Sequence, residues 1–464
     1  MNSTKLDELK TYFNDKCKST TIHAIPNIFK TKKCFIKLLW VFYLLASGSF
    51  CVYLILGAFF DYYSYDLITK ITVTYQNKLK FPIVSICNSN YYSKKYNLTV
   101  DDLNDLISTG NLNQNDFKDN LKDILITCKF NNKPCFYDKD FDYFYDSEYG
   151  PCFKFNSGKN INGTQINFKY VDLFDKKGLT LDLLIEPMTN QNLAKAQNGY
   201  YVFINDRSYD EIRTSSFVSP GFLTQFLIDK YTILKQPKPY SECSNKLTSI
   251  DSYDSIYYKK TFKLKNYYEI YFCFRFCAQK LLGDYCQYQS LEDGYYFYEQ
   301  MIRISEYELT DSQLECYANV SNLFAENLTA LNYCDCPLDC KIVDYKYTTS
   351  MAQFPTLSYF EQKLKNNPVI KSNFINKSNE LTFENLRQSV CRIVLFYERL
   401  QDVLITESPK IQIVNLISNI GGVIGLFLGL SFASFVELIE IGYFILDTFY
   451  FENKCKNLFN KIEK

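Results

Sequence analysis

The residues with the clearest chemical potential lie near the C-terminal end of the 464-residue chain, in the stretch SNIGGVIGLFLGLSFASFVELIE. Most of this stretch is apolar, yet it carries glycines, polar side chains and two carboxylates. These residues are Ser418, Asn419, Gly421, Gly422, Gly425, Gly429, Ser431, Glu437 and Glu440. Rings of carbonyl and hydroxyl oxygens can replace the hydration water of a hard cation such as Na⁺. The pattern therefore indicates a path for cations through an apolar medium.

The glycines have two interpretations. Gly421, Gly425 and Gly429 recur every four residues, so on a helix they form one stripe, and small residues let membrane helices pack closely. Alternatively, Gly429, which costs about 1 kcal/mol of helix stability relative to alanine, frees the chain to bend and to offer carbonyl groups to a cation. The spacing alone leaves both interpretations open.

The polar residues of the stretch favour a water-lined path. Ser418 and Asn419 would gain nothing on a lipid-facing helix, whereas they suit a helix that lines water. Glu437 and Glu440 either mark the inner end of the helix or attract cations to an inner mouth. Three copies of such a helix could surround an axis.

Two segments of the chain are long and apolar enough to span a membrane. Residues 38–60 are uncharged and would form a helix about 34 Å long, and the second segment is uncharged from Ile411 to Val436. A buried core helix is the alternative for each segment. Lysines precede the first segment and follow the second, so both termini are expected in the cytoplasm. We expect a cytoplasmic segment (1–36), a first transmembrane helix (37–60), an extracellular cysteine-rich domain (61–410), a second transmembrane helix with the pore (411–449) and a cytoplasmic tail (450–464).

The composition limits the class of protein. Lys plus Arg and Asp plus Glu are equal at 51 each, so bulk charge predicts no nucleic-acid partner. The 40 Tyr and 39 Phe indicate a tightly packed β-rich body or contact with a membrane. The sequence has a single histidine, His23, and no Ser/His/Asp set, phosphate loop or metal motif, which argues against an enzyme. We expect no cofactor and no metal centre.

The segment between the two spans has the pattern of an α+β domain. Runs rich in aromatic and β-branched residues predict strands, and longer apolar runs predict helices. The expected strands are 70–75, 81–87, 152–157, 179–186, 199–205 and 391–406, and the expected helices are 101–111 and 267–286. Strands from distant parts of the chain are expected to share one sheet.

Thirteen of the 17 cysteines lie within residues 87–391, on the expected oxidising side of the membrane. Cys273 and Cys277 have the same spacing as Cys336 and Cys340, so two antiparallel segments joined along facing edges would give nested bonds. The expected pairs are Cys87–Cys152, Cys128–Cys135, Cys243–Cys340, Cys273–Cys336, Cys277–Cys334 and Cys286–Cys316, with Cys391 unpaired. Spacing leaves the connectivity open, and a zinc cluster is the alternative for CDCPLDC. The same region holds five N-glycosylation sequons: Asn97, Asn162, Asn319, Asn327 and Asn376.

Six regions, in order along the chain, resemble segments of the degenerin, epithelial sodium channel and acid-sensing ion channel family. They are STTIHAIPNIF (19–29), FPIVSICN (81–88), YGPCFKFNSG (149–158), VSPGFLTQF with PKPYSEC (218–226 and 237–243), CDCPLDCKIVDYKYTTSMAQFP (334–355) and ESPKIQIVNLISNIGGVIGLFLGLS (407–431). The resemblance implies a trimeric membrane protein with two transmembrane helices flanking a large disulfide-rich α+β extracellular domain of the palm, thumb and finger type. It supports the nested pairing and implies one more thumb disulfide, whose first cysteine is replaced here by Tyr288.

The resemblance also implies roles for residues of the pore. Gly429, Leu430 and Ser431 correspond to the selectivity filter, the constriction where the helix breaks. Ser418 corresponds to the position where a bulky substitution holds such channels open, and Gly425 to the level at which amiloride binds. Leu430 is larger than the small residue usual in the middle of this triplet.

Two further pairs of residues take their expected roles from the resemblance. His23 and Ala24 correspond to a His-Gly segment that folds back into the inner mouth and supports opening. A methyl group at a backbone position that needs positive φ would strain this segment. Tyr65 and Tyr240 match aromatic positions that contact each other at the wrist and couple the thumb to the first span, with ordinary packing as the alternative.

We therefore expect a voltage-independent, sodium-preferring cation channel of the plasma membrane. It would be amiloride-sensitive and opened by an extracellular ligand such as a peptide or by mechanical force. It would act as a homo- or hetero-trimer with like subunits, in contact with membrane lipids.

Three alternatives differ in stimulus or class. A proton-gated member of the same family would need carboxylates of raised pKa, because no extracellular histidine is present; Asp210 and Glu211 lie roughly where an acidic cluster would fall, with a solvated loop as their other role. An ATP-gated purinergic trimer would need clustered Lys and Arg and a different cysteine series. A non-conducting two-span receptor or adhesion protein would be indifferent to replacement of Gly425 or Ser431.

Overall fold

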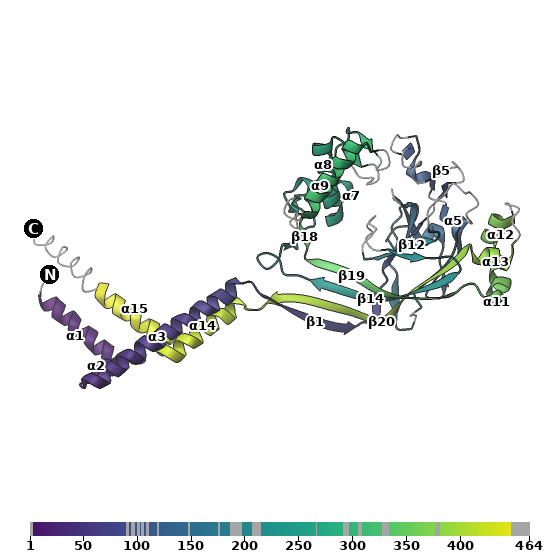
Figure 1. Ribbon diagram of the computed structural model, residues 1–464. Coiled ribbons are helices and arrows are strands. Elements are labelled where there is room, and N and C mark those ends of the chain that lie inside the picture. Colours follow the sequence, from purple (N-terminus) through teal and green to yellow (C-terminus); the bar gives the residue numbers. More distant parts are fainter. Residues whose placement is uncertain are drawn as a thin grey trace, which may run out of the picture. The chain divides into compact units, whose positions relative to one another are not determined.

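The computed structural model describes residues 3–446 except for 90–91, 94–97, 100–102, 104–105, 108–110, 118–119, 147–148, 175–176, 186–196, 207–214, 266, 291–296, 305–308, 327–333 and 376–380. Contacts divide the chain into two compact units, one of residues 69–407 and one of residues 1–68 with 408–464. The first unit is rich in β-strands and the second is helical (Figure 1).

The largest sheet of the first unit joins strands that are far apart in the sequence. Its order is β19 (Lys341–Gln353), β14 (Phe222–Leu234), β20 (Val390–Pro409), β11 (Leu179–Leu184), β6 (Leu125–Phe130) and β7 (Lys133–Pro134), and β1 (Leu67–Tyr75) also pairs with β20. β14 and β20 run parallel, and the other registered pairs along this path are antiparallel. In β20 the alternate residues Cys391, Ile393, Leu395 and Tyr397 are buried, which is the period of two expected for a half-buried strand.

A second sheet packs its side chains into the same core. Its order is β13 (Ser215–Val218), β12 (Tyr200–Asn205), β3 (Ile83–Asn88), β9 (Gly150–Phe155) and β8 (Phe141–Asp146), antiparallel throughout. Phe155, Tyr200 and Val202 of this sheet belong to one buried cluster with Leu181 and Ile393 of the large sheet. The strands expected from the sequence are therefore confirmed in both sheets, whereas the expected helix at 101–111 lies mostly outside the described residues.

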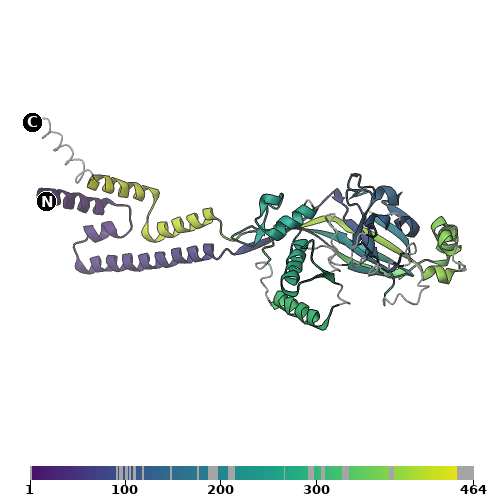
Figure 2. The same cartoon turned by 90° about the horizontal axis from the view of Figure 1, so that it is seen from above.

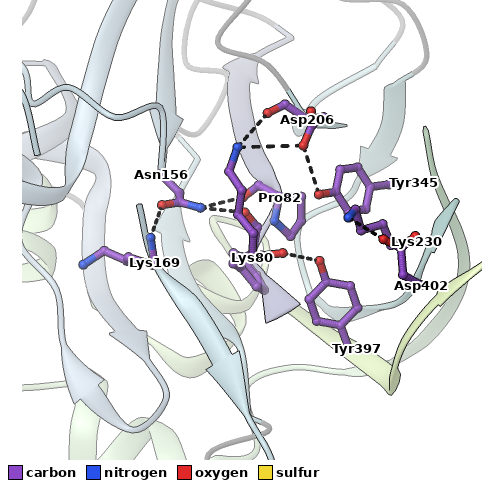
Figure 3. A network of polar contacts seen from close by, with 10 residues as sticks. Lys80, Pro82, Asn156, Lys169, Asp206, Lys230, Tyr345, Tyr397 and Asp402 are labelled. Atoms are coloured by element: carbon purple, nitrogen blue, oxygen red, sulfur yellow. Dashed lines mark hydrogen bonds and ion pairs between the residues drawn. The ribbon is translucent and has the colours of Figure 1, made fainter. Parts of the chain in front are cut away.

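A group of polar side chains lies where the two sheets meet (Figure 3). Lys80, from β2 (Lys78–Lys80), lies with its Nζ 3.8 Å from Oδ1 of Asp206, which follows β12. Tyr345 of β19 donates to the same oxygen at 3.5 Å, and Tyr397 of β20 donates to the carbonyl of Lys80 at 2.6 Å. Burial raises the pKa of both phenols, so each remains a protonated donor.

Three helices of the same unit enclose an aromatic and disulfide-rich core. They are α7 (Ile256–Lys265), α8 (Ile270–Cys286) and α9 (Asp311–Glu326). The disulfides Cys273–Cys336, Cys277–Cys334 and Cys286–Cys316 join α8 to its neighbours, and Cys243–Cys340, Cys87–Cys152 and Cys128–Cys135 join other parts of the unit. All six pairs are those expected from the sequence. Because the three cysteines of CDCPLDC are all oxidised, they supply no thiolate for zinc. Tyr288 is 2% exposed and fills the core where a further disulfide was implied.

One end of the large sheet carries a buried ion pair. Asp182 of β11 is fully buried and accepts from Nε of Arg392 at 2.6 Å and from its Nη2 at 2.8 Å. Thr127 and Tyr359 donate to the same carboxylate at 2.8 and 3.1 Å. The guanidinium also lies 4.4 Å from the ring centroid of Phe354. The hydrogen bond from Tyr359 attaches the short helix α11 (Leu357–Tyr359) to the sheet. The helices α11, α12 (Pro368–Ile375) and α13 (Phe383–Arg387) pack side chains into a separate apolar cluster.

The helical unit consists of α1 (Ser3–Ser19), α2 (Ile25–Lys30), α3 (Cys34–Tyr63), α14 (Ile413–Leu428) and α15 (Phe432–Leu446). α3 and α14 lie side by side (Figure 2), with the rings of Phe50 and Phe427 5.2 Å apart. α1 lies beside α15, with Tyr12 stacked on Phe444 at 3.8 Å. Among the described residues, α3 alone is long and apolar enough to cross a membrane as one helix, with a mean hydropathy of 2.0. Helices Ile413–Leu428 and Ala433–Phe444 meet the same test as a pair bent by 75°.

Candidate functional site

The break between α14 and α15 falls on Gly429, Leu430 and Ser431. Gly429 ends α14 in the left-handed conformation, with φ 69° and ψ 18°, and its N–H donates to the carbonyl of Gly425 at 3.0 Å. Leu430 and Ser431 are not helical, and α15 begins at Phe432. Of the two interpretations of Gly429, the structure agrees with the bend and not with a continuous helical stripe, because the left-handed turn removes Gly429 from the helix.

Glycine at 429 is required by a close neighbour as well as by its backbone angles. The N–H of His23 donates to the carbonyl of Leu428 at 2.8 Å, which holds the N-terminal segment against the end of α14. A Cβ at position 429 would lie 2.6 Å from Cγ and from Nδ1 of His23. The structure thus brings His23 together with Gly429, two positions whose expected roles, in a re-entrant motif and in a filter, came from separate parts of the sequence.

One face of α14 is covered and most of the rest of the helix is exposed. Leu416 is buried, and Ile420, Val423 and Phe427 follow it on the same face. The exposed residues on the rest of the helix include four of the sequence-identified pore positions: Ser418, Asn419, Gly421 and Gly422. No described atom lies within 4 Å of a Cβ built at Gly421 or Gly422, and a Cβ at Gly425 would lie 3.7 Å from the carbonyl oxygen of Leu430. The glycines are therefore not used for packing within the described part of one chain.

Ala24 has the backbone conformation that its position in the motif predicted. Its φ is 70° and its ψ is −36°, and its side chain is 3% exposed. It precedes α2, and its carbonyl accepts from the N–H of Ile28 at 3.0 Å. The methyl group thus occupies a buried place on a backbone that an L-residue adopts only with strain.

The two carboxylates of α15 are bound by the N-terminal segment. Oε2 of Glu437 accepts from the hydroxyl of Thr20 at 2.8 Å and from the N–H of Thr21 at 3.3 Å. Nζ of Lys16 lies 2.6 Å from Oε1 of Glu440. Both carboxylates stand out in the sequence, but their partners do not, because no spacing pattern links residues more than 400 positions apart. The one available signal was the pair of threonines beside His23.

A second polar group joins the segment after α3 to the segment before α14. Nζ of Lys410 lies 2.9 Å from Oδ2 of Asp66, and the backbone N–H of Lys410 donates to the carbonyl of Asp66, also at 2.9 Å. The hydrogen bond from Lys410 holds the pKa of Asp66 below its ordinary value. Tyr65 has φ 54°, and its ring is 6.3 Å from that of Tyr63. Tyr240 belongs to the other unit, so its expected contact with Tyr65 stays a prediction.

Of the remaining positions identified in the sequence, some lie within the residues that the structure describes and others lie outside them. Asn162 and Asn319 are exposed, as glycosylation requires. The positions outside the described residues are Asn97, Asn327, Asn376, Asp210, Glu211 and the segment 447–464. Among the described residues, no group of three or more His, Cys, Asp or Glu side chains could hold a metal ion.

Comparison with known proteins identifies relatives over nearly the whole chain. The family model "amiloride-sensitive sodium channel" matches residues 16–120 and 98–441. The bile acid-sensitive ion channel of Mus musculus is 23% identical, over 93% of this chain and 87% of its own length. Acid-sensing ion channel 1A of Danio rerio is 24% identical, over 92% of this chain and 87% of its own. The gamma subunit of the epithelial sodium channel of Pelodiscus sinensis is 26% identical, over 71% of this chain and 46% of its own length.

Among solved structures, a cryo-EM structure of a proton-activated chloride channel covers 89% of this chain and 100% of its own, at 8% identity. The TM-score is 0.35, which is too low to carry an argument about fold.

Proposed function

Because the chain belongs to the amiloride-sensitive sodium channel family, a family of ion channels and not of enzymes, we propose that it forms a trimeric, voltage-independent, sodium-preferring cation channel of the plasma membrane. The observation that carries this proposal is the break at Gly429–Ser431, where a left-handed glycine lies against His23 and ends one apolar helix before the next begins. Backbone and hydroxyl oxygens at such a break are the ligands that Na⁺ exchanges for water.

We assign the membrane topology from the two apolar segments. α3 is the first span, and α14 with α15 forms the second, bent at the filter. The termini are cytoplasmic, and the region within residues 61–410 is extracellular. Its six disulfides and the exposed sequons Asn162 and Asn319 support an oxidising exterior. The proposed cytoplasmic parts are 1–36 and 450–464, and lipid contacts the exposed apolar side chains of α3.

The proposed conduction path uses the exposed face of α14. Ser418, Asn419, Gly421 and Gly422 face the axis of the trimer, where their exposed positions contact water or a second copy. Since backbone groups at the break supply most of the oxygen ligands, the bulk of Leu430 at the middle of the filter is compatible with conduction. No cofactor is needed. The partners are like subunits, in a homo- or hetero-trimer.

The proposed stimulus is an extracellular ligand, such as a peptide, or mechanical force. One relative is named for bile acids and another for acid, so relatives of this chain respond to different stimuli. A second candidate is proton gating, and one residue favours it. Asp229 of β14 has a buried Oδ1 without a hydrogen-bond partner among the described residues, and burial, followed by the charge of Glu398, raises the pKa of its carboxyl.

Voltage clamp of cells that express this chain alone tests the proposal. External Na⁺ is exchanged for K⁺, and then amiloride, acid, bile acids and candidate peptides are applied in turn. We expect an amiloride-blocked current that reverses at a more positive voltage in Na⁺ than in K⁺ and whose conductance does not depend on voltage. Surface-expressed protein that passes no current under any of these conditions, even with a bulky residue at 418, would favour a receptor or adhesion protein.

A further inference from the structure

The carboxylates of α15 are bonded to the segment that immediately precedes His23. Glu437 binds the hydroxyl of Thr20 and the N–H of Thr21, and Glu440 binds Lys16. We propose that Glu437 and Glu440 are docking acceptors for residues 16–23, and that Lys16, Thr20 and Thr21 are positioning residues for the filter. This inference rests on the proposed channel function and replaces the interpretation of the two carboxylates as free charges at the inner mouth.

The contacts hold both sides of the filter break. On the α14 side, the His23 N–H binds the carbonyl of Leu428 at 2.8 Å, two residues after Thr21. On the α15 side, the fully buried Ser434 places its Oγ 2.7 Å from Oγ1 of Thr21 and accepts from the N–H of Ser431 at 3.1 Å. A single hydroxyl therefore links the N-terminal segment to the last residue of the filter.

Glu437 contributes more to this docking than Glu440. The Lys16–Glu440 pair is partly exposed, at 27% and 54%, and pairs of this kind contribute little on their own. Glu437 accepts two hydrogen bonds as a charged group, and such bonds are roughly twice as strong as neutral ones. Loss of the Thr20 hydroxyl or of the Glu437 acceptor should therefore release residues 20–23 and loosen the carbonyl of Leu428.

Substitutions at 437 separate docking from simple charge. Glu437→Gln keeps an acceptor and loses the charge, whereas Glu437→Ala loses both. Docking predicts that Glu437→Ala and Thr20→Val each lower the Na⁺/K⁺ permeability ratio, by about five-fold. Glu437→Gln should retain most of the ratio that Glu437→Ala loses, and Thr20→Ser should restore what Thr20→Val loses.

The double variant and a charge exchange complete the electrical test. The double variant Thr20→Val with Glu437→Ala should lower the permeability ratio no further than either single variant, because both substitutions remove the same interaction. Lys16→Glu should be partly rescued by Glu440→Lys. If the carboxylates act instead as free charges at the inner mouth, Glu437→Gln and Glu437→Ala should lose equal amounts of inward conductance, and Thr20→Val should leave the conductance unchanged. That result would overturn the proposal.

A cross-linking measurement reads docking without any current. Thr21→Cys with Ser434→Cys, in the full chain in membranes and with Cys17→Ser as background, should form an oxidant-induced disulfide that mass spectrometry detects. The matched control is Thr21→Cys with Val436→Cys, since residue 436 lies on the opposite face of α15 and is exposed. A disulfide between residues 21 and 434 in a protein whose wild-type form passes no current would contradict the channel function and support the docking. A wild-type current, with no disulfide between residues 21 and 434 and with an unchanged permeability ratio in the variants at positions 20 and 437, would reject the docking and leave the channel function in place.

Discussion

At Gly429 the backbone turns through φ 69°, and the place that a Cβ would occupy is already taken by the imidazole of His23. Both facts exclude a side chain, one through local strain and the other through contact. The same is not true of the other glycines of α14, around which the described chain leaves open space or ordinary contact distances. The glycines of one short stretch thus serve different purposes.

Replacement of Gly429 by alanine should abolish most of the current without loss of surface protein. The methyl group would have to displace the His23 ring from 2.6 Å and would adopt a left-handed conformation at a cost of about 1–2 kcal/mol. Voltage clamp combined with surface biotinylation measures both quantities. The matched control is Gly57→Ala on α3, where a Cβ meets nothing within 4 Å. Equal currents from the two variants would show that the contact is not needed.

Replacement of Ala24 by glycine should have the opposite effect. Glycine removes the strain of φ 70° and stabilises the re-entrant segment by about 1 kcal/mol, or roughly five-fold in an open-to-closed equilibrium that depends on the segment. Single-channel recording should show a higher open probability. Ala58→Gly, in the regular helix α3, removes the same methyl group without any such gain. A fall in open probability for Ala24→Gly would contradict the account.

At the scale of elements, one buried ion pair joins β11 to β20 within the large sheet and also binds Tyr359 of α11. Replacement of Arg392 by methionine leaves the fully buried Asp182 without its cation, so the free energy of unfolding should fall by about 3–5 kcal/mol. Thermal unfolding of detergent-solubilised protein measures this loss. Lys365→Met removes an exposed partner of Glu361 and should change stability by less than about 0.5 kcal/mol. Similar melting temperatures for both variants would contradict the assignment.

The response of the elements to pH should differ between two carboxylates. Lys410 lowers the pKa of Asp66, so their ion pair is kept at neutral pH and is lost only as pH falls through that lowered value, below about 4. Asp229 behaves in the opposite way. Burial raises its pKa, so its ionised form destabilises the fold at neutral pH, and protonation relieves this penalty as the pH falls through the raised value.

Asp229→Asn should therefore raise the melting temperature at neutral pH and flatten its rise on mild acidification, while Asp66→Asn should lower it at neutral pH. If protons open the channel, Asp229→Asn should also shift the half-activating pH, and Asp66→Asn should leave the response between pH 5 and 7 in place because that pair does not titrate there. Identical pH profiles for the wild type and Asp229→Asn would remove Asp229 as a sensor.

At the scale of the whole molecule, glycans report the proposed topology. Asn162 and Asn319 are exposed on the β-rich unit and should carry glycans if that unit is extracellular. Asn162→Gln and Asn319→Gln should each reduce the apparent mass by one glycan, and the double variant by two. Endoglycosidase treatment before electrophoresis provides the measurement. A wild-type mass that does not respond to the enzyme, with unchanged masses for all variants, would contradict an extracellular domain.

Much of this arrangement could be predicted from the sequence, because the signals are local or strictly spaced. The cysteine spacing, supported by the family resemblance, predicted the nested disulfides, and alternating apolar residues predicted the long strand β20. Other features could not be predicted in this way. The contacts of Glu437 with Thr20 and of Arg392 with Asp182 join distant residues of ordinary composition, and only the folded backbone brings them together. The glycine spacing alone could not predict the end of α14 at Leu428, since a glycine at every fourth position is equally compatible with a continuous helix; the break at Gly429 was predicted only by the family resemblance.

The central claim is that the break at Gly429–Ser431 lines a path for Na⁺. The most direct test measures the Na⁺ current through purified Ser418→Phe protein in liposomes. The current is recorded with and without the additional Ser431→Cys substitution, before and after a charged thiol reagent is added. We predict a sustained current with Ser418→Phe that the reagent stops only when Ser431→Cys is present. No current with Ser418→Phe, or a current in the Ser431→Cys protein that the reagent leaves intact, would contradict the account.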